Sequence, residues 1–524
     1  MKGKIEEIIA SGKCDDRQII AYHTFLFTIK SVSVSSLYCN LEILLTLLRS
    51  HRTRNIDPTI RLQRLNSYIL PLTSAWGGAE LTNSLSSFNS FCTLLGLDKA
   101  QDYMISNRVH EIKDFSAHQL DPHALALQTD LQEKFKVLPI RSTKAFITCS
   151  TEKLKKGSQS YNTACALWHD SIPVILPNLL KFITYVLSIS LLAYCTNSRR
   201  NAHAFHNPAN WGNLPSEFQS VIKRVLTDRF WQAGISTGSR DEFYENVSKT
   251  KTTMEGLASS IRGAIRMVRE CCYSILWCMS RLDVHFFGIH ELPGPLAHAL
   301  FADAHCLSSH QLSILLNMTR YIIDDCPPRY REHFLTPLLA TLFTQVDRKV
   351  SFEWQALLER AQVQLGEDKL AEEMKEESIL RQLTYIAVLI VAGLVDPSKT
   401  GAYPSARNSG GISDKISADI TGHGHYLNAV TPESEPPRTE QGMREFVLSS
   451  DAVLEPLILF CTHALRMRDS RCCGIIIRVF RSIVPEFTEE RADIREFICR
   501  EVLMAAIDVS ITYFDSCLDI TDLT

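Results

Sequence analysis

The hydrophobic positions along the chain recur mostly at helical spacing. Between residues 312 and 323, apolar side chains follow the i, i+3, i+4 pattern that gives a helix one buried stripe. Pro327 and Pro328 should end this helix, because proline lacks the backbone N–H and clashes with the preceding turn. A second apolar stripe begins at Leu335 and contains Pro337, where we expect a kink or a break. The pattern predicts a helix, a tight turn and a helix.

The same kind of pattern extends over most of the chain, and the alternation typical of strands is scarce. Ser351 is a candidate N-cap for a third helix after a short turn. Long helical patterns also cover Met254 to Leu282 and Leu383 to Val395. Roughly a dozen paired helices predict an all-α fold, an α-solenoid of HEAT-like helix-pair repeats of about 40–47 residues. Such a stack forms one long concave wall that suits a large partner.

One segment departs from this pattern. Residues 396–442 are rich in Gly, Ser, Pro, Thr and Asn and hold few large apolar side chains. This composition cannot bury enough surface to offset the entropy lost on ordering. We therefore predict a disordered insertion, with α-solenoid at residues 1–395 and again at residues 443–524. His423 and His425 lie in the insertion without neighbouring ligands, so we expect no metal site there.

Residues 172–195 form the most apolar stretch. Their number is close to the ~20 residues that a membrane-spanning helix requires. We nevertheless expect a buried helix without membrane insertion, because prolines and polar residues interrupt the stretch. The interrupting residues are Pro173, Pro177, Asn178 and Lys181.

Composition limits the choice of partner and compartment. The net charge is -3, so whole-chain basicity does not argue for nucleic acid. The 16 cysteines are scattered, and many lie in apolar helical patterns as buried thiols do. Without a secretory signal, we expect reduced cysteines and a nuclear or cytosolic compartment.

Positive charge is concentrated locally between residues 134 and 157. Phe135, Phe146 and Tyr161 are interleaved with the basic residues. A basic loop with aromatic rings can bind a nucleic-acid backbone by neutralising phosphates and stacking on bases. A solvated loop that joins two helices is the alternative. The candidate phosphate-binding residues of this segment are Arg141, Lys144, Lys153, Lys155 and Lys156.

A second basic group lies in the long helical pattern that begins at Met254. Arg262, Arg266 and Arg269 follow one another at spacings of four and three, which places them on one face of a helix. Two interpretations remain open. The face is either ordinary solvated surface, or a basic stripe on the inner wall of a solenoid that meets phosphates or acidic cargo.

Signs of catalysis are weak. The sequence around Ser236 matches G-x-S-x-G, but the nucleophile elbow of hydrolases needs a strand before the serine. Here the preceding segment has helical spacing, so we expect a loop between helices. The phosphate-loop motif, the dinucleotide-binding motif and C-x-x-C pairs are absent from the sequence. We expect no catalytic, cofactor-binding or metal-binding residues, and a protein that is not an enzyme.

Several stretches resemble one family of transport receptors. They include CPPRYREHFLTPLLATLFTQV from Cys326, SFEWQALLERAQ from Ser351, the acidic run from Glu367 to Glu377, and PGPLAHALFADAH. These stretches resemble the C-terminal half of exportin-5-like nuclear export receptors of the karyopherin-β (importin-β-like) family. Asp241-Glu242-Phe243 is similar to fungal members. The resembling motifs are structural rather than catalytic.

The resemblance implies a receptor that shuttles between nucleus and cytoplasm and contacts nuclear pore proteins. It implies binding of cargo together with Ran-GTP, the cargo being structured RNA or a phosphorylated protein held by basic inner-surface residues. In this family the N-terminal repeats carry the main Ran contact, and we expect this chain to lack them. The alternative is an α-helical repeat scaffold or adaptor that binds neither RNA nor Ran.

Overall fold

All regular structure in the described part of the chain is helical. The computed structural model describes residues 58–151, 154, 156–197, 221, 225–226, 251–361, 367–395, 438–467 and 469–521. The one extended pairing among these residues is an isolated bridge between Gln119 and Thr253. The predicted all-α class is therefore confirmed. The chain divides into two compact units, Met1–Ile289 and His290–Thr524.

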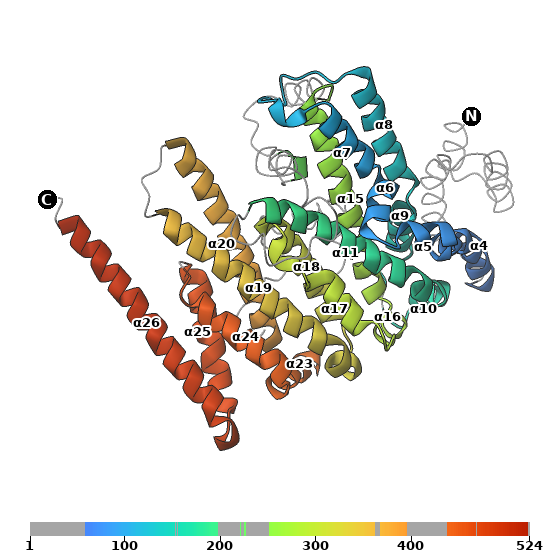
Figure 1. Ribbon diagram of the computed structural model, residues 1–524. Helices are drawn as coiled ribbons and strands as arrows, with labels where there is room; N and C mark the ends of the chain where they lie inside the picture. Colours follow the sequence, from blue (N-terminus) through green and yellow to red (C-terminus); the bar gives the residue numbers. More distant parts are fainter. Residues whose placement is uncertain are drawn as a thin grey trace, which may run out of the picture. The chain divides into compact units, whose positions relative to one another are not determined.

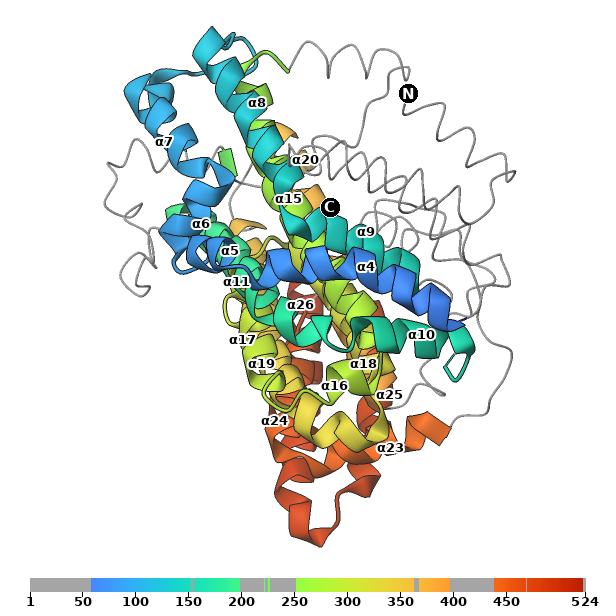
Figure 2. The same ribbon diagram turned by 90° about the vertical axis from the view of Figure 1, so that its right-hand side faces the viewer.

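Unit 1 is built around two long helices, α11 and α15. Helices α8 and α9 follow each other along α15, while α11 packs on both α4 and α15 (Figure 2). The helices described in unit 1 are α4 (Pro58–Gly77), α5 (Ala79–Ser84), α6 (Phe88–Leu95), α7 (Leu97–Ser106), α8 (Pro122–Val137), α9 (Pro139–Thr151), α10 (Gln159–Trp168), α11 (Ser171–Asn197), α15 (Met254–Ser280) and α16 (Val284–Phe287).

The apolar segment predicted as a buried helix is α11, and most of its apolar side chains described by the structure lie in the core of unit 1. Phe182 meets the ring of Trp76 edge to face, with 5.8 Å between the ring centroids. The amide of Asn178 donates a hydrogen bond to the carbonyl oxygen of Trp76 at 2.8 Å. The indole N–H of Trp76 donates to Oγ1 of Thr143 at 2.7 Å. The polar interruption at Asn178 thus has a partner inside the protein, as burial requires.

Two helical segments in the described residues are long and apolar enough to cross a membrane, residues 171–189 and 376–395. In the structure, 61% and 56% of these windows are buried inside the protein. Helix α11 packs on α4 and α15, and the second window belongs to a helix that packs on five others of its unit. Packing between helices accounts for the apolar character of both segments.

Unit 2 arranges its helices in two layers (Figure 1). In one layer α17 packs on α19, α19 on α24 and α24 on α26, and in the other α18 packs on α20 and α20 on α25. This stacking of helix pairs is that of an α-solenoid. The helices described in unit 2 are α17 (Pro293–Phe301), α18 (Ser309–Asp325), α19 (Arg331–Ala361), α20 (Glu367–Val395), α23 (Arg438–Ser449), α24 (Asp451–Ala464), α25 (Ser470–Ile483) and α26 (Ala492–Thr521).

Helix α19 is longer than the sequence pattern predicted. Helix α18 ends at Asp325, before the two prolines, as expected. Helix α19 then continues through Pro337 to Ala361, so a break at Pro337 and the predicted third helix are wrong. A kink at Pro337 stays a prediction. The stripe of buried apolar side chains on α19 continues across the expected turn, so the helix continues with it. Its fully buried members there are Phe343, Val346 and Val350.

The polar residues at the expected turn are instead paired within α19. The ammonium group of Lys349 donates to Oε1 of Glu353 at 2.8 Å, one helical turn later. The Ser351 hydroxyl donates to Oδ1 of Asp347 at 3.1 Å, so Ser351 lies inside the helix and does not cap one. Pairs at i, i+4 support a continuous helix.

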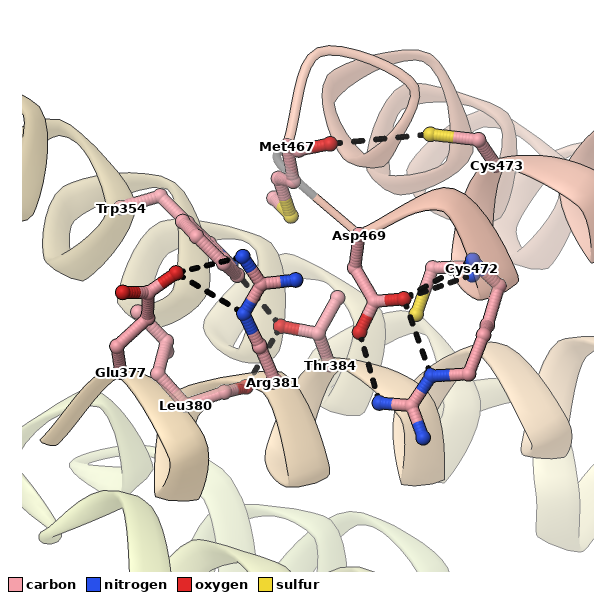
Figure 3. A network of polar contacts seen from close by, with 10 residues as sticks. Trp354, Glu377, Leu380, Arg381, Thr384, Met467, Asp469, Cys472 and Cys473 are labelled. Carbon is pink, nitrogen blue, oxygen red and sulfur yellow. Dashed lines mark hydrogen bonds and ion pairs between the residues drawn. The ribbon is translucent and has the colours of Figure 1, made fainter. Parts of the chain in front are cut away.

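A buried tryptophan connects α19 to α20 (Figure 3). The indole N–H of Trp354 donates to Oγ1 of Thr384 at 3.0 Å. The guanidinium carbon of Arg381 lies 5.6 Å from the centroid of the Trp354 ring. Arg381 is itself held by the Glu377 carboxylate at 2.6 Å. The ring, the hydroxyl and the ion pair together fix the side-by-side position of the two helices.

Helix α25 begins with a capping carboxylate in the same network (Figure 3). Asp469 accepts hydrogen bonds from the backbone N–H groups of Arg471 and Cys472 at 3.0 and 3.4 Å. The Arg471 guanidinium also donates to this carboxylate at 3.1 Å. Burial disfavours the charged form of Asp469, but the hydrogen bonds and charge of Arg471 hold its pKa below the usual value. Asp469 is thus a charged N-cap.

Arg444 of α23 joins the ends of two other helices. Its guanidinium donates to the carbonyl oxygen of Val395 at 3.0 Å, where α20 ends. It also donates to the hydroxyl and carbonyl oxygens of Ser482 at 2.6 and 2.9 Å, and to Glu486 at 3.1 Å. One side chain therefore satisfies several acceptors that helix ends leave without partners.

The predicted insertion is described only at its end. Helix α23 begins at Arg438, inside the predicted range of 396–442. Residues 396–437, with His423 and His425, lie outside the described residues. The same holds for Ser236 and its G-x-S-x-G motif, and for Asp241 to Phe243. The predicted boundaries at 395 and 443 remain predictions.

Replacing Arg444 by alanine is expected to destabilise unit 2 by about 2–3 kcal/mol, because buried acceptors lose a charged donor. Urea unfolding of the purified chain measures this loss. The matched control is Glu445→Ala, since Glu445 is the exposed neighbour on the same helix. Equal unfolding midpoints for the two variants would show that Arg444 does not hold the helix ends together.

A second prediction concerns pH. Nδ1 of His463 on α24 lies 2.8 Å from Oδ1 of Asp347 on α19, and this hydrogen bond raises the pKa of His463. Burial and Arg466 oppose the rise, and the charge of Glu501 on α26 adds to it. Because the folded pKa lies above the unfolded one, the stabilisation is complete below about pH 6.5 and is lost as pH rises through the folded pKa.

His463→Asn should therefore lower the urea midpoint more at about pH 5.5 than at about pH 8.5. The exposed His298 on α17 supplies a control, and His298→Asn should give only a small change. A constant difference between parent and His463→Asn across this range would contradict the assignment.

Candidate basic surface on helices α9 and α15

The segment predicted as a basic loop is mostly helical. Helix α8 ends at Val137, Leu138 has extended backbone angles, and α9 begins at Pro139. Proline suits this first position, because its missing N–H would have no helical partner there. Phe135 and Phe146 are 3% and 1% exposed. Their rings belong to the core of unit 1, so the predicted loop with stacking phenylalanines is wrong.

Helix α9 brings two of the predicted basic residues to α15. Arg141 and Lys144 are one helical turn apart on α9, and both are half-buried. Burial raises the pKa of the Cys271 thiol on α15, and the charges of Lys144 and Arg141 oppose this rise. Burial also raises the pKa of Cys278, and the charges of Arg281 and Lys144 are among the groups that oppose it. The three cations therefore lie along the same stretch of α9 and α15.

Two of the three arginines predicted to form a stripe do not face solvent. Arg262 donates to Oε1 of Glu255 at 2.6 Å and to the carbonyl oxygen of Val225 at 3.2 Å. Arg269 is only 3% exposed. The two positions are seven residues apart, so they point in nearly the same direction from the helix, toward its packed side. Neither is placed to contact a large partner in this structure.

Arg266 is the exposed member of the three. Its side chain is 53% exposed, and its Nε lies 4.0 Å from Oε1 of Glu270. An ion pair this long and exposed holds the arginine weakly. Arg266 therefore remains able to pair with an anion from a partner.

The sequence pattern missed one part of the surface. The guanidinium carbon of Arg281 lies 5.7 Å from the centroid of the Trp277 ring. The signal was present, because the two residues are spaced i, i+4 in a helical stretch and such pairs meet on the helix surface. Trp277, which is half-buried, supports a cation at the edge of the surface.

Lys156 adds a cation from the segment after α9. Its side chain is 61% exposed, and its ammonium nitrogen lies 3.5 Å from Oδ2 of Asp283. Lys153 and Lys155 lie outside the described residues. We use the name α9–α15 basic surface for a set of five side chains, four of them from the predicted candidates. They are Arg141, Lys144, Lys156, Arg266 and Arg281.

The chemistry available to this surface is ionic rather than catalytic. Its five cations are accompanied by the carboxylates of Glu270 and Asp283, and by the ring of Trp277. Among the described residues, no group of three or more His, Cys, Asp and Glu side chains is arranged to hold a metal ion. Such a surface can bind anions, and guanidinium groups suit phosphate in particular.

Comparison with known proteins identifies relatives over nearly the whole chain. An uncharacterized protein of Schizosaccharomyces pombe is 26% identical over 477 residues, covering 88% of this chain and 35% of that protein. Protein MSN5 of Saccharomyces cerevisiae is 24% identical over 453 residues, covering 84% of this chain and 33% of MSN5. Exportin-5 of Mus musculus is 24% identical over 212 residues, 39% of this chain and 17% of the mouse protein.

The family assignment rests on a match that covers both units. The chain spans about a third of the length of the two fungal relatives. No solved structure matches it. The sequence model of the Exportin-5 family matches residues 39–519. The chain belongs to the Exportin-5 family.

Proposed function

We propose that this chain is a cargo-binding part of a nuclear export receptor that carries structured RNA or phosphorylated protein together with Ran-GTP. Membership of the Exportin-5 family supports the receptor role, since exportins are transport receptors and not enzymes. The helical stacking of unit 2 agrees with a receptor that encloses its cargo. Because the chain spans about a third of its fungal relatives, the complete transport cycle is part of the proposal.

One observation carries the cargo assignment. Helix α9 places Arg141 and Lys144 against α15. The positive charge continues along α15 with the exposed Arg266. At the C-terminal end of α15 it continues with Arg281, which lies over the ring of Trp277. RNA and phosphorylated protein present the same group, the phosphate, to such a surface. The net charge of the whole chain is -3, so attraction of an anion has to come from a local surface of this kind.

The remaining partners follow from the family. The proposed receptor shuttles between nucleus and cytoplasm, contacts nuclear pore proteins and uses no cofactor. Binding of Ran-GTP strengthens cargo binding, and its loss releases the cargo. We assign these contacts to no particular residue of the described part.

The cargo proposal predicts steep salt dependence. The triple variant Arg141→Glu, Lys144→Glu, Arg266→Glu should bind a short hairpin RNA at least about tenfold more weakly than the parent chain. The slope of log K against log salt should fall by roughly 0.7–0.9 for each RNA phosphate that the variant no longer neutralises. Fluorescence anisotropy at several salt concentrations measures both quantities. A second variant with Glu at Lys153, Lys155 and Lys156 tests the neighbouring lysines.

The control for this experiment is Arg495→Glu, which reverses one exposed charge on α26 in unit 2. Thermal melts of all variants separate loss of binding from loss of folding. An unchanged RNA affinity in the folded triple variant would remove the α9–α15 basic surface from the proposal. Absence of RNA binding by the parent at low salt would favour phosphorylated protein as cargo, or the scaffold alternative.

The Ran proposal has a separate test. GTP-loaded Ran is expected to raise the affinity of the chain for hairpin RNA, because ligands that are thermodynamically coupled tighten each other's binding. GDP-loaded Ran is the control for a nonspecific effect of added protein. Equal RNA affinity with GTP-loaded and GDP-loaded Ran would contradict Ran coupling within this chain. It would not contradict the proposed phosphate contacts of unit 1.

A further inference from the structure

Helix α25 has one largely exposed side. Its apolar side is buried against α20 and α24. On the opposite side, the Arg471 side chain is 62% exposed and Ile477 is 45% exposed. At 100° per residue, five residues share this side. They form what we call the α25 outer face: Arg471, Gly474, Ile477, Arg478 and Arg481.

The α25 outer face is positively charged. The helix contains three arginines and no acidic residue. Arg471 is paired with Asp469 and stacks on Tyr385 of α20, with 5.2 Å between its guanidinium carbon and the ring centroid. Arg478 and Arg481 are exposed and make no hydrogen bond or ion pair in the part of the chain that the structure describes. Two uncompensated cations on one face attract an acidic partner.

Gly474 lies at the centre of this face, and the fold gives no reason for a glycine there. Glycine inside a helix is less stable than alanine, because more backbone entropy is lost on folding. A Cβ atom added at Gly474 would meet nothing within 4 Å. Its backbone angles are not in the left-handed region either, since the glycines with positive φ are Gly96 and Gly157. A glycine at an open position does, however, allow another backbone to approach closely.

The shape and composition of the face favour a helix over a nucleic acid. A row of arginines alone would suit a phosphate backbone, but Ile477 offers that backbone no favourable contact. An amphipathic helix can cover Ile477 with an apolar side chain and pass over Gly474 at short distance. Arg471 and Arg481 are ten residues apart, about 15 Å along the helix, which matches about three turns of a partner helix. Side-by-side helix packing is also how α20 binds the neighbouring flank of α25.

We propose that the α25 outer face is a docking site for an acidic amphipathic helix of a partner protein. Acidic side chains of the partner pair with Arg478 and Arg481, and its apolar stripe covers Ile477 and Gly474. This site lies in unit 2 and uses none of the residues of the α9–α15 basic surface. It therefore does not depend on the phosphate-binding proposal.

The probe for this site is a fluorescently labelled synthetic peptide of about 14 residues, or four helical turns, with one stripe of Leu flanked by Glu. Anisotropy with the complete chain should show saturable binding. Arg478→Glu with Arg481→Glu should weaken it at least tenfold, and Gly474→Gln should weaken it to a similar degree. A peptide with Lys in place of every Glu, and a scrambled peptide of unchanged composition, should not bind.

Gly474→Gln separates docking from folding. Glutamine is a better helix former than glycine and the Cβ atom that it adds meets no neighbour there, so the Tm of this variant should equal or exceed that of the parent. Gly263→Gln is the matched control, because Gly263 is also a helical glycine with open space around its missing Cβ, on α15. It should leave peptide binding unchanged.

Several outcomes would overturn the proposal. They are absence of peptide binding by the parent, equal binding of the scrambled peptide, and full binding by either α25 variant. The face would be assigned to nucleic acid instead if hairpin RNA displaced the peptide from the parent chain. In that case RNA binding would be lost in the variant with both Arg478→Glu and Arg481→Glu, and kept in Gly474→Gln. Self-association of the parent that the same changes abolish would assign it to a second copy of this chain.

Discussion

Burial of the apolar side chains of each helix against its neighbours, within its layer and across the two layers, is the constraint on which unit 2 depends. Leu338, Leu339 and Leu342 of α19 are fully buried in this way. Each such side chain contributes roughly 1.5–3 kcal/mol on leaving water. The side of a helix that no neighbour covers, such as the side of α25 that carries its arginines, remains available for charge. The network around Trp354 and the Arg444 contacts then fix the order in which neighbouring helices stack.

The sequence was sufficient for the fold class and for two of the long helices, because apolar periodicity is a local property. It predicted α11 and α15 within a few residues. It failed at α19, where Ser351 suggested the N-cap of a new helix. A serine that caps a helix cannot be distinguished by sequence from a serine that bonds to a side chain one turn earlier in the same helix. The sequence also placed Phe146 in a loop, since an aromatic residue among lysines has the same local pattern whether its ring is buried or exposed.

The candidate site was predictable in its charges but not in its geometry. Spacing placed Arg262, Arg266 and Arg269 on one face correctly, yet it could not show which part of that face another segment covers. Nor could it show that α9 lies against α15, which is a contact between segments more than a hundred residues apart. The α25 outer face became visible only when burial separated its arginines from the apolar side of the same helix.

Two surfaces of the chain differ in their chemistry, one suited to phosphate in unit 1 and one suited to an acidic helix in unit 2. The proposed receptor role depends most on the first, where cargo phosphate would meet the chain at α9 and α15. Ultraviolet crosslinking of a hairpin RNA to the purified chain, followed by identification of the crosslinked peptides, tests this contact. We expect crosslinks concentrated in residues 139–156 and 262–283 and suppressed by added salt. Crosslinks confined to other segments, or insensitive to salt, would contradict the assignment of cargo phosphate to α9 and α15.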